Sequence, residues 1–175
     1  ITDKAVKENS QYHNLSKYAD SCYIDSYYTN RAIFCDMDGV LAAQTTLPII
    51  NNEIDLVNGE IHKWQKTVGP VITQLLRMER ENAAELYILS ATPNSFSSDE
   101  KKEWLAKYFP SMPAHRVFFV NQGKHKAEML ENLARKLKIP KSDVLMVDDT
   151  HAILYDVKAR GMNAMHVSEF LTLNN

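Results

Sequence analysis

The chain has 175 residues, of which 45% are hydrophobic and 24% are charged, and its formal net charge is −2. This composition is that of a globular domain long enough to bury a core, and it gives no reason to expect broad electrostatic binding to nucleic acid. No apolar run approaches the roughly 20 residues that a membrane-spanning helix needs, so no membrane association is expected.

The first 30 residues are polar and rich in tyrosine, and their helical pattern is weak. We expect residues 1–30 to form an N-terminal extension of a domain that covers residues 31–175. The first residues lack the apolar core of a signal peptide, and two cysteines, Cys22 and Cys35, do not make a disulfide framework. A cytoplasmic protein is therefore expected.

Residues 32–36 form a short apolar run, which predicts a buried strand. The run ends in two carboxylates, Asp36 and Asp38, and Gly39 follows at once. Because a buried, unpaired carboxylate is too costly to keep for packing alone, this strand end predicts a functional site.

The helical and extended patterns are interrupted over residues 42–67, where Asn58-Gly59 is a strong hairpin signal. We expect a short β-rich flap there, a small cap insertion of about 25 residues that leaves the neighbouring site open.

After the flap, helices and strands alternate. Their signals predict a helix from Pro70, a strand at 86–89 ending at Ser90, a helix opened by Ser97 and Glu100, a strand at 116–120, a helix from near Lys124, a strand at 144–147 ending in Asp148 and Asp149, a helix closed by Gly161 and a strand at 163–167. Such alternation predicts an α/β fold, a Rossmann-like parallel sheet with helices on both faces.

In such sheets the ligand lies beyond the carboxyl ends of the strands, where this sequence carries four acids, one hydroxyl and one or two lysines. Carboxylates this close together repel one another unless a cation intervenes, and a set of oxygen ligands favours Mg²⁺. Lysine and serine suit a phosphoryl group. One aspartate can then attack phosphorus while the second transfers protons.

These residues resemble the four motifs of the haloacid dehalogenase superfamily. Asp36-Met37-Asp38-Gly39-Val40 is similar to its first motif, Ser90 to its second, Lys126 to its third and Asp148-Asp149 to its fourth. The motifs occur in the family's order, each at a predicted strand end, and the resemblance spans residues 32–167. It departs from the family pattern in the helix after Asp149, which lacks the acid often found three or four residues further on.

The resemblance implies a role for each motif residue in a Mg²⁺-dependent phosphatase. Asp36 would be the nucleophile, and Asp38 the general acid and base, with its backbone carbonyl on the metal ion. Ser90 and the backbone amide of Ala91 would bind phosphoryl oxygens. Lys126 would neutralise the intermediate, with Lys124 as the rival for that role. Asp149 would be the direct metal ligand of the last motif, with Asp148 alongside.

The substrate is less well specified. Residues 99–110 resemble the linker helix of the 5'(3')-deoxyribonucleotidase group, which favours a small phosphate ester such as a nucleoside monophosphate. An open flap also fits a nucleic-acid end, as in a 3'-phosphatase, or a cap supplied by the partner subunit of a homodimer. A catalytically idle binding domain with the same fold is the remaining alternative.

Overall fold

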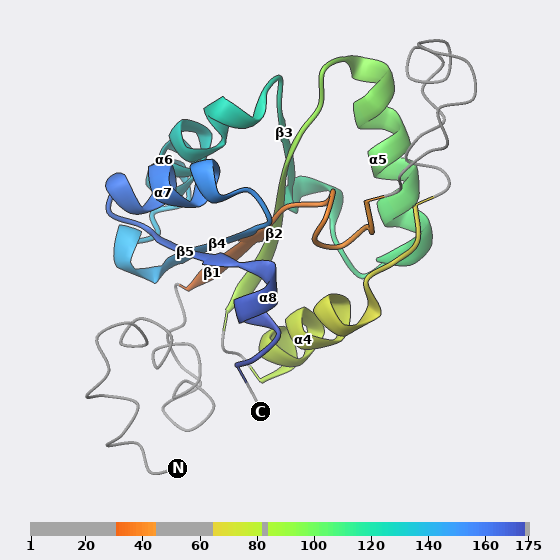
Figure 1. Cartoon of the computed structure of the whole chain (residues 1–175), viewed down its shortest axis with the longest axis horizontal. Coiled ribbons are helices and arrows are strands. Elements are labelled where there is room, and N and C mark those ends of the chain that lie inside the picture. Colours follow the sequence, from red (N-terminus) through yellow and green to blue (C-terminus); the bar gives the residue numbers. More distant parts are fainter. Residues whose placement is uncertain (1–30, 45–64, 82–83, 174–175) are drawn as a thin grey trace.

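The structure is a computed structural model that describes residues 31–44, 65–81 and 84–173. Within these residues five strands form one parallel sheet in the order β3-β2-β1-β4-β5 (Figure 1). The strands are β1 (Ala32–Cys35), β2 (Glu85–Ala91), β3 (Val117–Val120), β4 (Val144–Asp148) and β5 (Asn163–His166). The prediction of a Rossmann-like parallel sheet is confirmed.

Helices cover both faces of this sheet (Figure 1). They are α4 (Gly69–Arg80), α5 (Ser95–Tyr108), α6 (Lys126–Lys136), α7 (His151–Ala159) and α8 (Val167–Phe170), with short 3-10 turns at η3 (Ala114–Arg116), η4 (Gly123–His125) and η5 (Lys141–Asp143). One hydrophobic cluster contains side chains of α4, α5 and α8, and a second contains side chains of α6 and α7. The sheet therefore lies between two layers of helices.

Strand β1 lies at the centre of the sheet and is completely covered. Its four residues are at most 1% exposed, and it pairs with β2 on one side and with β4 on the other. The chain runs outward from β1 to β2 and β3, and then returns across β1 to β4 and β5. The order of the strands reverses between β1 and β4, and such a switch point opens a crevice for a ligand at the carboxyl ends of the strands.

Two helix starts differ from the sequence-based expectation. Helix α5 begins at Ser95 and its N-cap is Asn94, whose side chain accepts a hydrogen bond from the Ser97 amide at 2.9 Å. Asn is as good an N-cap as Ser, so assigning the start to Ser97 was wrong. Helix α6 begins at Lys126, because one turn of 3-10 helix takes up the three residues before it.

The C-terminal part holds one confirmed feature and one that was not anticipated. Gly161 has a φ of +84° just past α7, as expected for a glycine that ends a helix. Helix α8 was not expected, since four residues are too few to show a helical period. The N-terminal extension and the predicted hairpin at Asn58-Gly59 lie outside the described residues.

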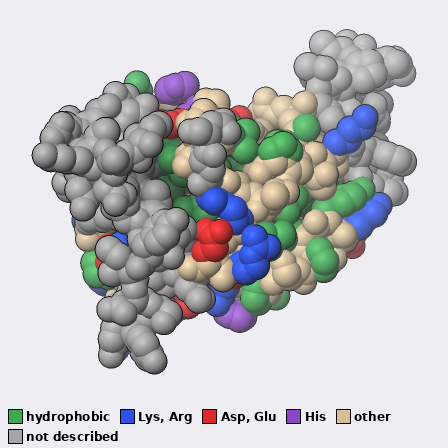
Figure 2. Space-filling view, turned by 90° about the horizontal axis from the view of Figure 1, so that it is seen from below, with side chains coloured by type: hydrophobic (Ala, Val, Ile, Leu, Met, Phe, Trp, Pro, Cys, Tyr) green, Lys and Arg blue, Asp and Glu red, His purple; other side chains and the backbone are tan. Residues whose placement is uncertain are grey.

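The surface carries mixed charge. Figure 2 shows acidic and basic side chains side by side near the centre of one face, with hydrophobic side chains scattered among them. In the part of the chain that the structure describes, none of the helices has the length and apolarity to cross a membrane.

Candidate active site

Asp36 is the first residue beyond β1, and the strand fixes its position. Its amide donates to the carbonyl of Val147 at 3.0 Å, which continues the ladder between β1 and β4. Its side chain is buried, with Oδ1 accepting from the Met37 amide at 2.8 Å and Oδ2 2.7 Å from the ammonium of Lys126. The carboxylate that follows β1 and the lysine that begins α6 thus meet at the switch point.

Asp148 and Asp149 come from the end of β4 and complete an acidic cluster. Asp148 is fully buried; its Oδ2 lies 2.8 Å from the same Lys126 ammonium, and its Oδ1 accepts from the Thr150 amide at 2.9 Å. Asp149 is partly exposed. One ligand oxygen each from Asp36, Asp148 and Asp149 all lie within 4.8 Å of one another, so these three residues can hold a metal ion.

Gly39 makes room for this cluster. Its φ of +76° is the left-handed conformation that glycine adopts readily. A Cβ at this position would lie 2.1 Å from Oδ2 of Asp149. The glycine after the two acids of the first motif is therefore required both for the turn of the chain and for the close approach of the β4 carboxylate.

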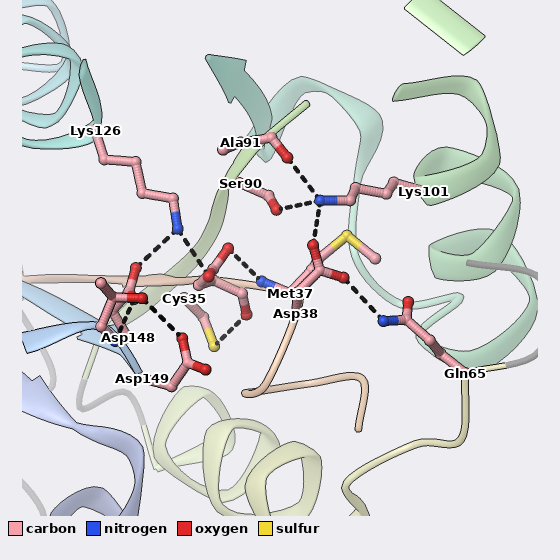
Figure 3. A network of polar contacts seen from close by, with 12 residues as sticks. Cys35, Met37, Asp38, Gln65, Ser90, Ala91, Lys101, Lys126, Asp148 and Asp149 are labelled. Atoms are coloured by element: carbon pink, nitrogen blue, oxygen red, sulfur yellow. Dashed lines mark hydrogen bonds and ion pairs between the residues drawn. The ribbon is translucent and has the colours of Figure 1, made fainter. Parts of the chain in front are cut away.

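Asp38 points away from the three-acid cluster, toward α5 (Figure 3). Its Oδ2 lies 2.6 Å from the Lys101 ammonium, and its Oδ1 accepts from Nε2 of Gln65 at 3.0 Å. The side chain of Asp38 is 32% exposed. The two acids of one motif thus have different environments: Asp36 is buried beside Lys126, and Asp38 is half-buried beside Lys101.

The cluster shifts the pKa of its members. Burial raises the pKa of Asp36 and the charge of Asp148 adds to this, while Lys126 opposes both. Burial also acts to lower the pKa of Lys126, but the charges of Asp36 and Asp148 outweigh it, so this pKa is raised. Burial, together with the nearby charge of Asp36, raises the pKa of the Cys35 thiol well above its ordinary value. Lys126 is therefore charged at neutral pH and Cys35 is a neutral thiol.

The structure brings most of the predicted site residues together. Lys126 contacts Asp36, whereas Lys124 is exposed. Ser90 is fully buried in β2, and its hydroxyl accepts from the Lys101 ammonium at 2.9 Å. The carbonyl of Ala91 accepts from the same group at 2.7 Å.

Two residues of the site were missed by sequence reasoning, Lys101 and Gln65. Lys101 lies in a run of charged residues that reads as a solvated helix surface, yet it is 1% exposed. A signal was present, because Lys101 precedes the buried Trp104 by three residues and residues at this spacing share a helix face. Gln65 gave no signal, since its place depends on how the chain returns after residues 45–64.

The parallel sheet with helices on both faces is an α/β architecture that is also found in a solved haloacid dehalogenase-like hydrolase. A hydrolase of the haloacid dehalogenase-like family from Streptococcus pneumoniae superimposes with a TM-score of 0.55 at 12% sequence identity, over 84% of this chain and 92% of that one. This likeness establishes the shared fold.

Two further solved structures are similar at lower scores. An uncharacterized protein from Corynebacterium glutamicum matches with a TM-score of 0.49 at 16% identity, over 78% of this chain and 83% of that one. The 3-deoxy-D-manno-octulosonate 8-phosphate phosphatase of Moraxella catarrhalis, solved with magnesium, phosphate and KDO, matches with a TM-score of 0.46 at 16% identity, over 80% of this chain and 66% of that one. No family model and no curated protein matches the sequence.

Proposed function

We propose that this protein is a Mg²⁺-dependent phosphomonoesterase of the haloacid dehalogenase superfamily that works through an aspartyl-phosphate intermediate. The observation that carries the proposal is the buried group at the switch point, where Lys126 lies 2.7 Å from Asp36 and 2.8 Å from Asp148, with Asp149 beside them. The fold shared with a haloacid dehalogenase-like hydrolase supports the same class.

In the first step an oxygen of the Asp36 carboxylate attacks phosphorus and the bond from phosphorus to the ester oxygen breaks. Asp38 gives its proton to the leaving oxygen, so that an alcohol departs. In the second step Asp38 takes a proton from water, the water oxygen attacks the same phosphorus, and the bond to Asp36 breaks. Inorganic phosphate and the Asp36 carboxylate result.

Lys126 keeps the nucleophile in the form that attacks. Burial and Asp148 favour the protonated form of Asp36, because they raise its pKa. The ammonium of Lys126 opposes this and favours the carboxylate. Among the described residues, Asp36 and Asp148 use two of its three N–H donors. The third is available for a phosphoryl oxygen, the role that the third motif implies. Ser90 and the amide of Ala91 bind the other phosphoryl oxygens.

The donor set fits Mg²⁺. Three carboxylates with no histidine or cysteine among them suit a hard cation. Asp36 and Asp149 would hold it directly, with the backbone carbonyl of Asp38, and Asp148 would lie alongside. When bound, the ion neutralises charge on the carboxylates and on the phosphoryl group.

The proposed substrate class is nucleoside monophosphates or related small phosphate esters. Its support is the similarity of residues 99–110 to the linker helix of the deoxyribonucleotidase group. Side-by-side assays on deoxynucleoside monophosphates and 3'-phosphorylated oligonucleotides test it. Faster turnover of the oligonucleotides would replace this substrate class with nucleic-acid ends.

The reaction class is tested by Asp36→Asn, which keeps the size of the side chain and removes the nucleophile. We expect this variant to fold as the wild type does and to release no phosphate from 4-nitrophenyl phosphate with Mg²⁺ present. A wild-type protein that turns over no phosphate ester would instead point to a binding domain.

A further inference from the structure

Lys101 is a second buried lysine of the site, and it has a different set of partners from Lys126. It is 1% exposed, although a lysine is seldom buried unless it is paired. Its ammonium lies 2.6 Å from Oδ2 of Asp38, 2.9 Å from the hydroxyl of Ser90 and 2.7 Å from the carbonyl of Ala91. Lys101 thus joins the end of β2 to the second acid of the first motif (Figure 3).

An ammonium has three N–H donors, and these three acceptors match them one to one. Lys101 therefore has no donor left for a substrate oxygen in this arrangement. Whatever it contributes to the reaction passes through the residues it holds, and of these Asp38 is the one that transfers protons in the proposed mechanism.

Helix α5 reaches Asp38 by a second route. Trp104 lies one helical turn after Lys101, and its indole N–H donates to the carbonyl of Gln65 at 2.9 Å. The side-chain amide of Gln65 in turn donates to Oδ1 of Asp38 at 3.0 Å. One face of α5 thus fixes both oxygens of the Asp38 carboxyl, one directly and one through Gln65.

We propose that Lys101 is the positioning residue for Asp38, and that helix α5 sets the plane in which Asp38 delivers its proton to the leaving oxygen. This inference rests on the proposed function, since it needs Asp38 to be the general acid. Each carboxyl oxygen has two lone-pair sites. The contacts with Lys101 and Gln65 take one of these sites on each oxygen, and this fixes the plane of the carboxyl group.

The consequence depends on the leaving group. An alkyl phosphate needs a proton on its leaving oxygen, whereas 4-nitrophenolate is stable enough to depart without one. Loss of Lys101 should therefore slow the cleavage of alkyl phosphates far more than that of 4-nitrophenyl phosphate. A purely structural role, or a role in holding Ser90 alone, would slow both to the same extent.

The test compares Lys101→Met with Lys102→Met on 4-nitrophenyl phosphate and on an alkyl phosphate that the wild type hydrolyses, either a deoxynucleoside 5'-monophosphate or glycerol phosphate. Lys102 is the matched control, because it is the next residue but is 60% exposed and forms its ion pair with Asp99 on its own helix. Misplacing a catalytic group can cost about 100-fold. We expect Lys101→Met to lower kcat for the alkyl ester at least about tenfold more than for the aryl ester, with KM little changed, and Lys102→Met to change neither.

Gln65→Leu provides a second variant if Lys101→Met does not fold. It removes the other donor to Asp38 without leaving a buried charge, and we expect the same bias against the alkyl ester. Equal losses on the two esters, or no loss, would overturn the inference while leaving the proposed phosphatase intact. A wild-type protein without activity on either ester would overturn the proposed function itself.

Discussion

Two clusters of charged side chains in this molecule each place one charge between two opposite charges, but one cluster is buried and the other lies at the surface. At the switch point, Lys126 lies between two acids, Asp36 and Asp148, and its side chain is 3% exposed. On the outside of the same layer of helices, Glu131 lies between two bases, with Lys141 at 2.5 Å and Arg160 at 2.9 Å. The side chain of Lys141 is 47% exposed.

Burial decides what each group does. The hydrogen bonds from Lys141 and Arg160 lower the pKa of Glu131, because together they outweigh the opposing effect of desolvation. Asp36 also has a base beside it, yet its pKa is raised, because burial outweighs the lysine. The outer group therefore contributes a little stability, whereas the inner group holds charge at a cost in stability that a structural role does not require. For this physical reason we assign the candidate functional site to the inner group.

Among the variants of these two groups, Lys126→Met is expected to have the largest effect on stability. It leaves two buried acids without their cation, and breaking a buried pair costs about 3–5 kcal/mol. Burial and mutual repulsion then raise the pKa of Asp36 above its unfolded value, so the folded state binds more protons than the unfolded state between those two values. Stability is thus lost as the pH rises through this window and regained as it falls. Urea unfolding in EDTA at pH 5 and pH 8 measures this change in the free energy of unfolding.

Lys141→Met is the matched control for that variant, since Lys141 is the lysine of the outer group. We expect it to change stability by less than about 1 kcal/mol and to leave phosphatase activity unchanged. A loss of stability as large as that of Lys126→Met would show that burial does not separate the two groups.

Gly39→Ala is expected to have an effect of intermediate size. The left-handed φ costs an alanine about 1–2 kcal/mol, and the new Cβ would displace the carboxylate of Asp149, which lies 2.1 Å away. We expect a weaker response to Mg²⁺, measured as the concentration that gives half-maximal activity.

Gly161→Ala has the same cost in φ but no such neighbour. Gly161 lies beside the outer group, where the nearest atom to a new Cβ is a Lys141 side-chain carbon at 3.8 Å. It should lose a similar amount of stability and keep the Mg²⁺ dependence of the wild type. If both variants changed the Mg²⁺ dependence equally, the clash with Asp149 would not be its cause.

Glu131→Gln has the smallest expected effect. Because Lys141 and Arg160 lower the pKa of Glu131, its contribution to stability is present above the ordinary pKa of a glutamate and is lost as the pH falls through the lowered one. The variant should therefore unfold at a slightly lower temperature than the wild type at pH 7, with the difference vanishing in acid. A difference that grows in acid would contradict this sign.

The strand ends were the part of the site most open to prediction from the sequence. A parallel sheet brings the carboxyl ends of its strands to one edge, so Asp36, Ser90 and Asp148 could be placed near one another from the apolar runs that precede them. The sequence also predicted all five strands, and the signal was nearly continuous in β1 and β4, whose residues are all buried.

The residues that come from other elements could not be predicted in this way. Lys101 lies within a helix, and its place at the site depends on how α5 packs against the sheet, which no local pattern states. The position of Gln65 depends on where the chain rejoins the domain, which no local pattern states either. The start at Asn94 was missed because two residues near it can cap a helix equally well. Where packing between elements sets the position of a side chain, local sequence patterns are compatible with several positions.

In the proposed mechanism, Asp36 carries the phosphoryl group during turnover. Acid quenching of the wild-type protein during hydrolysis of a ³²P-labelled ester should trap label on the protein. The label should be released by hydroxylamine, as an acyl phosphate is, and should map to the peptide that contains Asp36. Asp36→Asn should trap none. Phosphate release by the wild type without a hydroxylamine-labile label, or label retained in Asp36→Asn, would contradict the role of Asp36 as nucleophile.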